Sequence, residues 1–150
     1  MRVLRITVVL VLLVLALAMP RGSVSAQGAA PPAYVVIVHP SNAATTLQRA
    51  FVEDAFLKKV TRWPNGDGVR PVDLGPDSPV RRRFSEDVLR RSVEAVRSYW
   101  QQIIFAGRDI PPPELDTDDE VVKYVLKHPG GIGYVSSGAK TGGAKVVTVR

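Results

Sequence analysis

The sequence contains no cysteine, only two histidines, and few aromatic residues, which make up 7% of the chain. Without cysteine the chain has no disulfide, no thiolate metal site and no thiol nucleophile. The histidines, His39 and His128, are not spaced as metal ligands, and no hydroxyl or amine nucleophile stands in a motif with a base. We therefore expect a protein that is not an enzyme, binds no metal and needs no cofactor.

The longest apolar run lies at the N-terminus. Two arginines precede an apolar stretch over residues 6–18, and Val24-Ser25-Ala26 supplies the small residues of a cleavage site. This order is typical of a secretory signal peptide over residues 1–26, with cleavage near Ala26–Gln27. We therefore expect a periplasmic protein. The alternative is an uncleaved anchor, although the run is short for a membrane span.

The mature chain carries only a small excess of positive charge. The formal net charge is +6, and removal of residues 1–26 takes three arginines and no acid, which leaves +3. Nucleic-acid-binding domains usually carry a larger and more clustered positive charge. The sequence therefore does not predict a nucleic-acid partner.

The mature chain alternates strand and helix patterns. Residues 27–33 form an Ala- and Pro-rich leader, which we expect to be flexible. Residues 34–38 are a continuous apolar run, typical of a strand buried on both faces, and further strands are expected at 69–74, 132–135 and 146–149. Between them lie helical patterns whose expected caps are Thr45 or Thr46, Ser78, Ser92 and Thr117. The order predicts one α/β domain over 34–150, with a mostly parallel sheet flanked by helices.

Three consecutive arginines, Arg81, Arg82 and Arg83, lie in and just past the first turn of the helix that is expected to begin at Pro79. Ser78 suits the N-cap, and Pro79 suits the first helical position. The arginines oppose the positive end of the helix dipole. Either nearby carboxylates offset this repulsion, or the turn receives an anion.

Arg81 is the arginine that local pairing does not explain. Its neighbours have acids one turn further on, at positions 86 and 87, but Ser85 follows Arg81 at that spacing. An anion site here would use the hydroxyl of Ser78, the N–H groups of Val80 and Arg81, and the Arg81 guanidinium. The alternative is that Ser78 and Pro79 only start a helix.

A second group of candidate ligand residues, Ser41 and Asn42, follows the first predicted strand. In open α/β sheets, ligands gather at the carboxyl ends of strands, so these side chains could face the same crevice as Ser78. The alternative is that they form a turn or cap the next helix.

Two segments resemble the periplasmic phosphate-binding proteins of the phosphate ABC transporter. Phe56–Trp63 resembles their Ile-Phe-Leu-Gly-Lys-x-Thr-x-Trp segment, and Gly131–Val135 resembles their Gly-Ala-Ile-Gly-Tyr-Val strand. The order of motifs along the mature chain is also similar to a group of short exported proteins described as phosphate substrate-binding-like. The resemblance implies a single lobe of a type II periplasmic-binding-protein fold. It also implies phosphate or a similar oxyanion as ligand, and a transporter permease or another periplasmic protein as partner.

The chain also departs from that family. Full-length phosphate-binding proteins are about twice as long and carry Ser-Gly-Thr where this chain has Ser78-Pro79-Val80, which removes one hydroxyl and one backbone donor. Lys58 stands where the family often has glycine, at a helix end where a side chain is strained. An alternative function is therefore a periplasmic accessory or protein-interaction domain that has lost ligand binding.

Overall fold

A computed structural model describes residues 33–150, and these residues belong to one compact unit. The predicted signal peptide and almost all of the predicted leader lie outside the described residues. Within the described part of the chain, no helix combines the length and the apolar character needed to cross a membrane.

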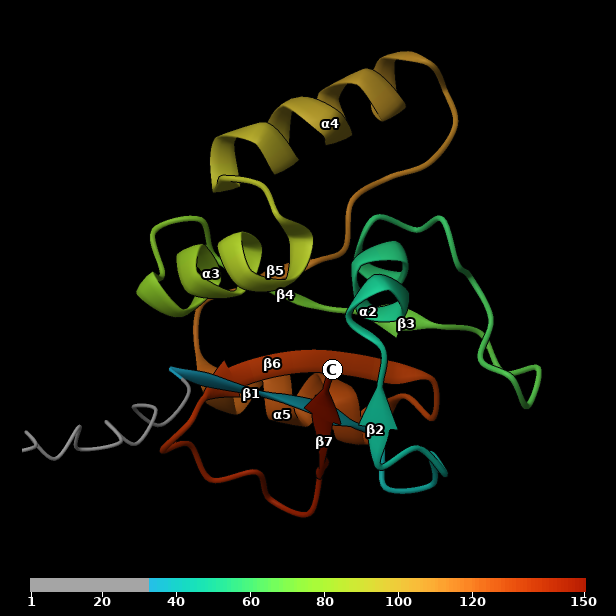
Figure 1. The fold of residues 1–150 in the computed structure, drawn as a ribbon, viewed down its shortest axis with the longest axis vertical. Coiled ribbons are helices and arrows are strands. Elements are labelled where there is room, and N and C mark those ends of the chain that lie inside the picture. Colours follow the sequence, from blue (N-terminus) through green and yellow to red (C-terminus); the bar gives the residue numbers. More distant parts are fainter. Residues whose placement is uncertain (1–32) are drawn as a thin grey trace, which may run out of the picture. The chain divides into compact units, whose positions relative to one another are not determined.

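The main sheet has five strands in the order β2-β7-β1-β6-β3 (Figure 1). The strands are β1 (Tyr34–Val38), β2 (Thr46–Leu47), β3 (Arg70–Pro71), β6 (Gly131–Ser136) and β7 (Lys145–Val149). β1 runs antiparallel to both β6 and β7, whereas β2 and β3 each run parallel to their single neighbour. The predicted α/β class is confirmed, but the sheet is mixed rather than mostly parallel. The apolar run of β1 indicates burial on both faces. A central strand is buried in this way whether its neighbours run parallel or antiparallel to it.

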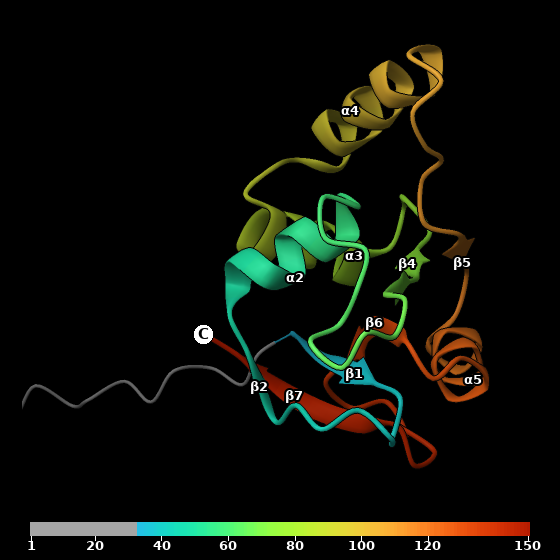
Figure 2. The ribbon, with the colours of Figure 1, turned by 90° about the vertical axis from the view of Figure 1, so that its right-hand side faces the viewer.

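Within residues 33–150, four α-helices accompany the sheet. Two views show α2 and α3 on one side of it and α5 on the other (Figures 1 and 2). The helices are α2 (Arg49–Phe56), α3 (Pro79–Phe84), α4 (Val93–Phe105) and α5 (Asp118–Lys127). α3 continues into a π-helical turn, η2 (Ser85–Leu89). Buried aromatic rings join the layers, because Phe84 of α3 stacks on Tyr134 of β6 with ring centroids 3.8 Å apart. This stack fixes α3 against the sheet.

The predicted strand over 69–74 is divided between two sheets. β3 lies in the main sheet, while β4 (Asp73–Leu74) pairs in parallel with β5 (Glu114–Leu115) as a separate two-stranded sheet. Val72 lies between the two strands and is fully buried. The division matters for the site, because it carries Asp73 and the following turn out of the main sheet.

Three of the four predicted helix caps are present. The side chains of Ser78 and Ser92 each accept a backbone hydrogen bond at the start of α3 and α4, and Thr117 forms a capping box at α5. The cap predicted at Thr45 or Thr46 is wrong, because Thr46 lies in β2, which pairs with the C-terminal strand β7. α2 begins after Gln48 without a side-chain cap.

Lys58 follows α2 in the left-handed backbone conformation, with a φ angle of 52°. The sequence predicted strain at this position. Apart from glycine, this conformation costs about 1–2 kcal/mol per residue. Lys58 also forms an ion pair with Asp109 at 3.0 Å, which ties the end of α2 to the loop after α4.

Candidate functional site

The turn that begins α3 presents both side-chain and backbone donors. Ser78 accepts a hydrogen bond from the backbone N–H of Arg81 at 3.3 Å, as expected of an N-cap, and Pro79 occupies the first helical position. The N–H of Val80 has no acceptor within residues 33–150. The turn is only partly buried, so a solute can reach it. Its dipole is modest, because α3 has only six residues before the π-helical turn.

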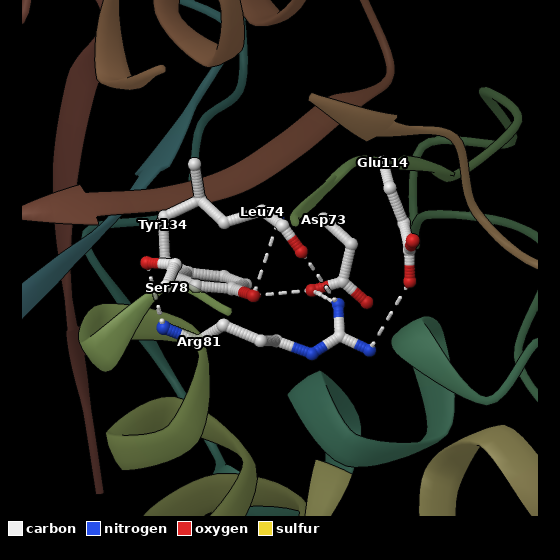
Figure 3. Close-up of polar contacts among 6 residues, drawn as sticks. All are labelled: Asp73, Leu74, Ser78, Arg81, Glu114 and Tyr134. Carbon is white, nitrogen blue, oxygen red and sulfur yellow. Dashed lines mark hydrogen bonds and ion pairs between the residues drawn. The ribbon is translucent and has the colours of Figure 1, made fainter. Parts of the chain in front are cut away.

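The side chain of Arg81 extends away from Ser78 into the protein (Figure 3). It is 3% exposed, and its Nη1 forms an ion pair with Asp73 and donates to the carbonyl of Leu74 at 3.3 Å. Its Nη2 lies 3.9 Å from the carboxylate of Glu114. The sequence left two explanations for this arginine, a nearby carboxylate or a bound anion. The structure supplies a nearby carboxylate, and it comes from Asp73 of β4 and not from the next helical turn.

Tyr134 completes the buried network. Its hydroxyl donates to the Asp73 carboxylate and accepts a hydrogen bond from the N–H of Leu74 at 3.3 Å. Burial raises the pKa of Tyr134 above its ordinary value, and the charge of Arg81 partly opposes that rise. Burial also lowers the pKa of Arg81, although Tyr134 and Glu114 act in the opposite direction. The network joins β4, α3 and β6, and the opposite charges of its buried pair compensate each other.

The two exposed arginines of α3 differ in their contacts. Arg83 forms the expected pair with Asp87 at 3.0 Å. Arg82 does not pair with Glu86 but donates to the backbone carbonyl of Asp77 at 3.3 Å. This hydrogen bond links α3 to the residue that precedes its N-cap.

Ser41 and Asn42 lie beyond the carboxyl end of β1, in a separate place. Ser41 is exposed, with its Oγ 2.7 Å from Nδ1 of His39. Asn42 is buried and accepts from the N–H of Ala44 at 2.9 Å, which is the turn chemistry expected as an alternative. Asn42 lines one cavity, whereas Arg81 lines another of about 370 Å³ beneath α4. The structure therefore brings Ser78, Val80 and Arg81 together but does not join them to Ser41 and Asn42.

Sequence reasoning missed Asp73, Tyr134 and Glu114 as partners of Arg81. Tyr134 lies in the Gly131–Val135 segment that carries the resemblance, and Asp73 lies in the strand predicted over 69–74. A search beyond the helical i,i+4 spacing would have found Asp73 eight residues before Arg81. Over residues 33–150, no group of three His, Cys, Asp or Glu side chains is arranged to hold a metal ion.

Comparison with known proteins gives a structural likeness only. No family model and no curated protein matches the sequence. An ABC-type phosphate transport receptor from Vibrio cholerae aligns with a TM-score of 0.60 and 14% identity, over 78% of this chain and 46% of the receptor. A protein from Clostridium perfringens, described as a phosphate ABC transporter substrate-binding protein with bound phosphate, aligns with a TM-score of 0.60 and 20% identity, over 78% of this chain and 44% of that protein. PstS from Borrelia burgdorferi aligns with a TM-score of 0.60 and 12% identity, over 79% of this chain and 47% of PstS.

These three proteins share a fold with this chain at sequence identities of only 12–20%. The chain spans less than half the length of each of them. The likeness was expected from the segments around Trp63 and Tyr134. The chain has the fold of one part of the phosphate ABC transporter substrate-binding proteins.

Proposed function

We propose that this protein is an exported oxyanion-binding protein that holds phosphate or a similar oxyanion at the turn before α3. The observation that carries the proposal is the shared fold with phosphate receptors, one of which contains bound phosphate. The predicted signal peptide over residues 1–26 would deliver the protein to the periplasm. A transporter permease or another periplasmic protein would be its partner.

Ser78 and Val80 would make the main contacts to the anion. The Ser78 hydroxyl and the N–H of Val80 lie at the open end of α3, where backbone donors favour negative charge. Arg81 would add a positive field, but its backbone N–H already donates to Ser78 and its guanidinium is paired with Asp73. Since a single lobe also leaves one side of the ligand in water, we expect weak binding. Ser41 and Asn42 lie at a separate position, in the turn after β1, so the proposed oxyanion site does not include them.

A matched pair of cap variants tests the assignment. Ser78→Ala and Ser92→Ala each remove a serine that caps a helix, with cap hydrogen bonds of 3.3 and 3.2 Å. Each should therefore cost about 1 kcal/mol of stability. In calorimetric titrations with phosphate and sulfate, only Ser78→Ala should lose the heat of binding. Equal heats from both variants would contradict the assignment of the site to α3.

A second function, an accessory or protein-interaction domain without a ligand, is favoured by two observations. Pro79 lacks a backbone donor at the first position of α3, and the Arg81 guanidinium already forms an ion pair with Asp73. This function predicts no response to millimolar phosphate or sulfate while the fold is intact. It also predicts that crosslinking in cells recovers a periplasmic partner.

A further inference from the structure

A cavity of about 520 Å³ lies between the start of α2 and the turn that follows Trp63. It is larger than the cavity beneath α4. Its lining includes Asn42, Leu47, Phe51 and Trp63. The volume falls within the about 300–1,000 Å³ typical of small-molecule sites and exceeds the about 150 Å³ that holds benzene in an engineered core.

The walls of this cavity are held by contacts from distant parts of the chain. Leu47 lies in β2 and pairs with Val149 of β7. The indole N–H of Trp63 donates to the carbonyl of Gly130 at 3.0 Å and is buried. Phe51 packs against Trp63 with ring centroids 5.2 Å apart. Because β2, β7 and the turn before β6 hold these residues, the cavity is already formed in the absence of a ligand.

The chemistry of the lining favours a neutral ligand. No acidic or basic side chain lines the cavity, and two aromatic rings, Leu47 and Pro64 supply apolar surface. The ammonium of Lys145 donates to the backbone carbonyls of Asn42 and Ala43 at 3.0 and 3.3 Å but is not part of the lining. A phosphate or carboxylate placed here would therefore lose hydration without gaining a lining group of opposite charge. The cavity is therefore distinct in kind, as well as in place, from the turn before α3.

Asn42 provides one directed polar group. It is only 9% exposed, and its Oδ1 accepts the N–H of Ala44 at 2.9 Å. Its amide nitrogen donates no hydrogen bond to any residue in the 33–150 range, and Asn42 is one of the residues that line the cavity. The amide of Asn65, by contrast, is already bonded to Asp67 through both its oxygen and its nitrogen.

We propose that this cavity is a second ligand site, which binds neutral ring-containing small molecules with an oxygen acceptor directed at the amide of Asn42. The ring would lie against Phe51 and Trp63, where an aromatic ring favours offset or edge-to-face contact. The site is independent of the oxyanion site, and neither ligand competes with the other.

The test uses Trp63 as the reporter in a Trp100→Phe background, because these are the two tryptophans of the chain. Benzyl alcohol, benzoate and benzylamine share a ring and differ in charge. Benzyl alcohol should change the Trp63 emission saturably in the millimolar range, as expected of a small fragment, while the two charged probes bind at least tenfold more weakly. Equal binding of benzoate, or no change in Trp63 emission with any probe, would overturn the proposal.

Variants in the same background locate the binding. Ala43→Phe fills the cavity from an exposed position and should abolish the response, whereas Ala95→Phe on the exposed face of α4 should leave it unchanged. Asn42→Asp keeps the acceptor for Ala44 but loses the donor, and should weaken binding of acetophenone, whose carbonyl can only accept a hydrogen bond, about tenfold. An unchanged response in Ala43→Phe would overturn the proposal. Ser78→Ala should not affect this response, so the two proposed sites can fail separately.

Discussion

The buried ion pair between Asp73 and Arg81 predicts a large loss of stability when its acid is neutralised. The side chains of Arg81 and Asp73 are 3% and 4% exposed. Asp73→Asn keeps the shape and still accepts the hydroxyl of Tyr134, but it leaves the Arg81 charge without its buried partner. Removing one member of a buried pair costs about 3–5 kcal/mol. Because Glu114 and the Leu74 carbonyl still contact the guanidinium, we expect about 3 kcal/mol, at the low end of that range.

Urea unfolding followed by tryptophan fluorescence measures this loss. With a urea m-value of about 1.5 kcal/mol/M, a loss of about 3 kcal/mol lowers the midpoint by about 2 M. Asp87→Asn is the matched control, because it breaks the exposed pair with Arg83, whose side chains are 58% and 39% exposed. That pair should contribute less than about 1 kcal/mol. If Asp73→Asn shifts the midpoint no more than Asp87→Asn, the buried network does not hold α3 as described.

Three further predictions follow from local geometry. Lys58→Gly relieves the φ angle of 52° and should raise stability by up to about 1 kcal/mol in thermal unfolding, whereas Lys58→Ala should show no gain. Gly133→Ala would place a Cβ 2.8 Å from a methyl group of Val121 and should cost about 1–3 kcal/mol in urea unfolding, while Gly138→Ala meets open space and should cost far less. Burial, with help from a nearby carboxylate, raises the pKa of Tyr34 to about 12 from about 10 in the unfolded chain. Between pH 10 and 12 the unfolded chain gives up this proton while the folded protein keeps it, so the free energy of unfolding falls as the pH rises through this range. Tyr34→Phe should reduce that fall in thermal unfolding.

The parts of the fold that depend on local signals were predictable from the sequence. β1 coincides with the apolar run at 34–38, and α5 begins at the predicted capping box of Thr117. The caps Ser78 and Ser92 are likewise encoded within one helical turn. These signals need only residues that are close in the chain.

The parts that depend on distant pairing were not predictable. The sheet is mixed because β1 pairs with β6 and β7, which follow it by roughly a hundred residues. A continuous apolar run indicates burial but carries no information on the direction of the neighbouring strand. The same limit applies to Thr46, whose pairing with Thr148 of β7 keeps the chain extended where a helix cap was expected.

The candidate site shows the same division. Ser78, Val80 and the backbone of Arg81 are near one another because they belong to one turn, which the sequence shows directly. The position of the Arg81 side chain depends on its ion pair with Asp73. Asp73 can contact Arg81 because β4 leaves the main sheet and pairs with β5. The i,i+4 rule examines one helix and cannot detect such a partner.

The central claim, that the turn before α3 receives an oxyanion, is tested most directly by the backbone amide of Val80. In a phosphate titration followed by ¹H–¹⁵N correlation spectra, this amide should shift saturably at millimolar phosphate, because its N–H has no acceptor within residues 33–150. The amide of Ala95, at the capped start of α4, serves as the control and should move far less. A Val80 amide that does not move, or that moves no more than Ala95, would contradict the proposed oxyanion site.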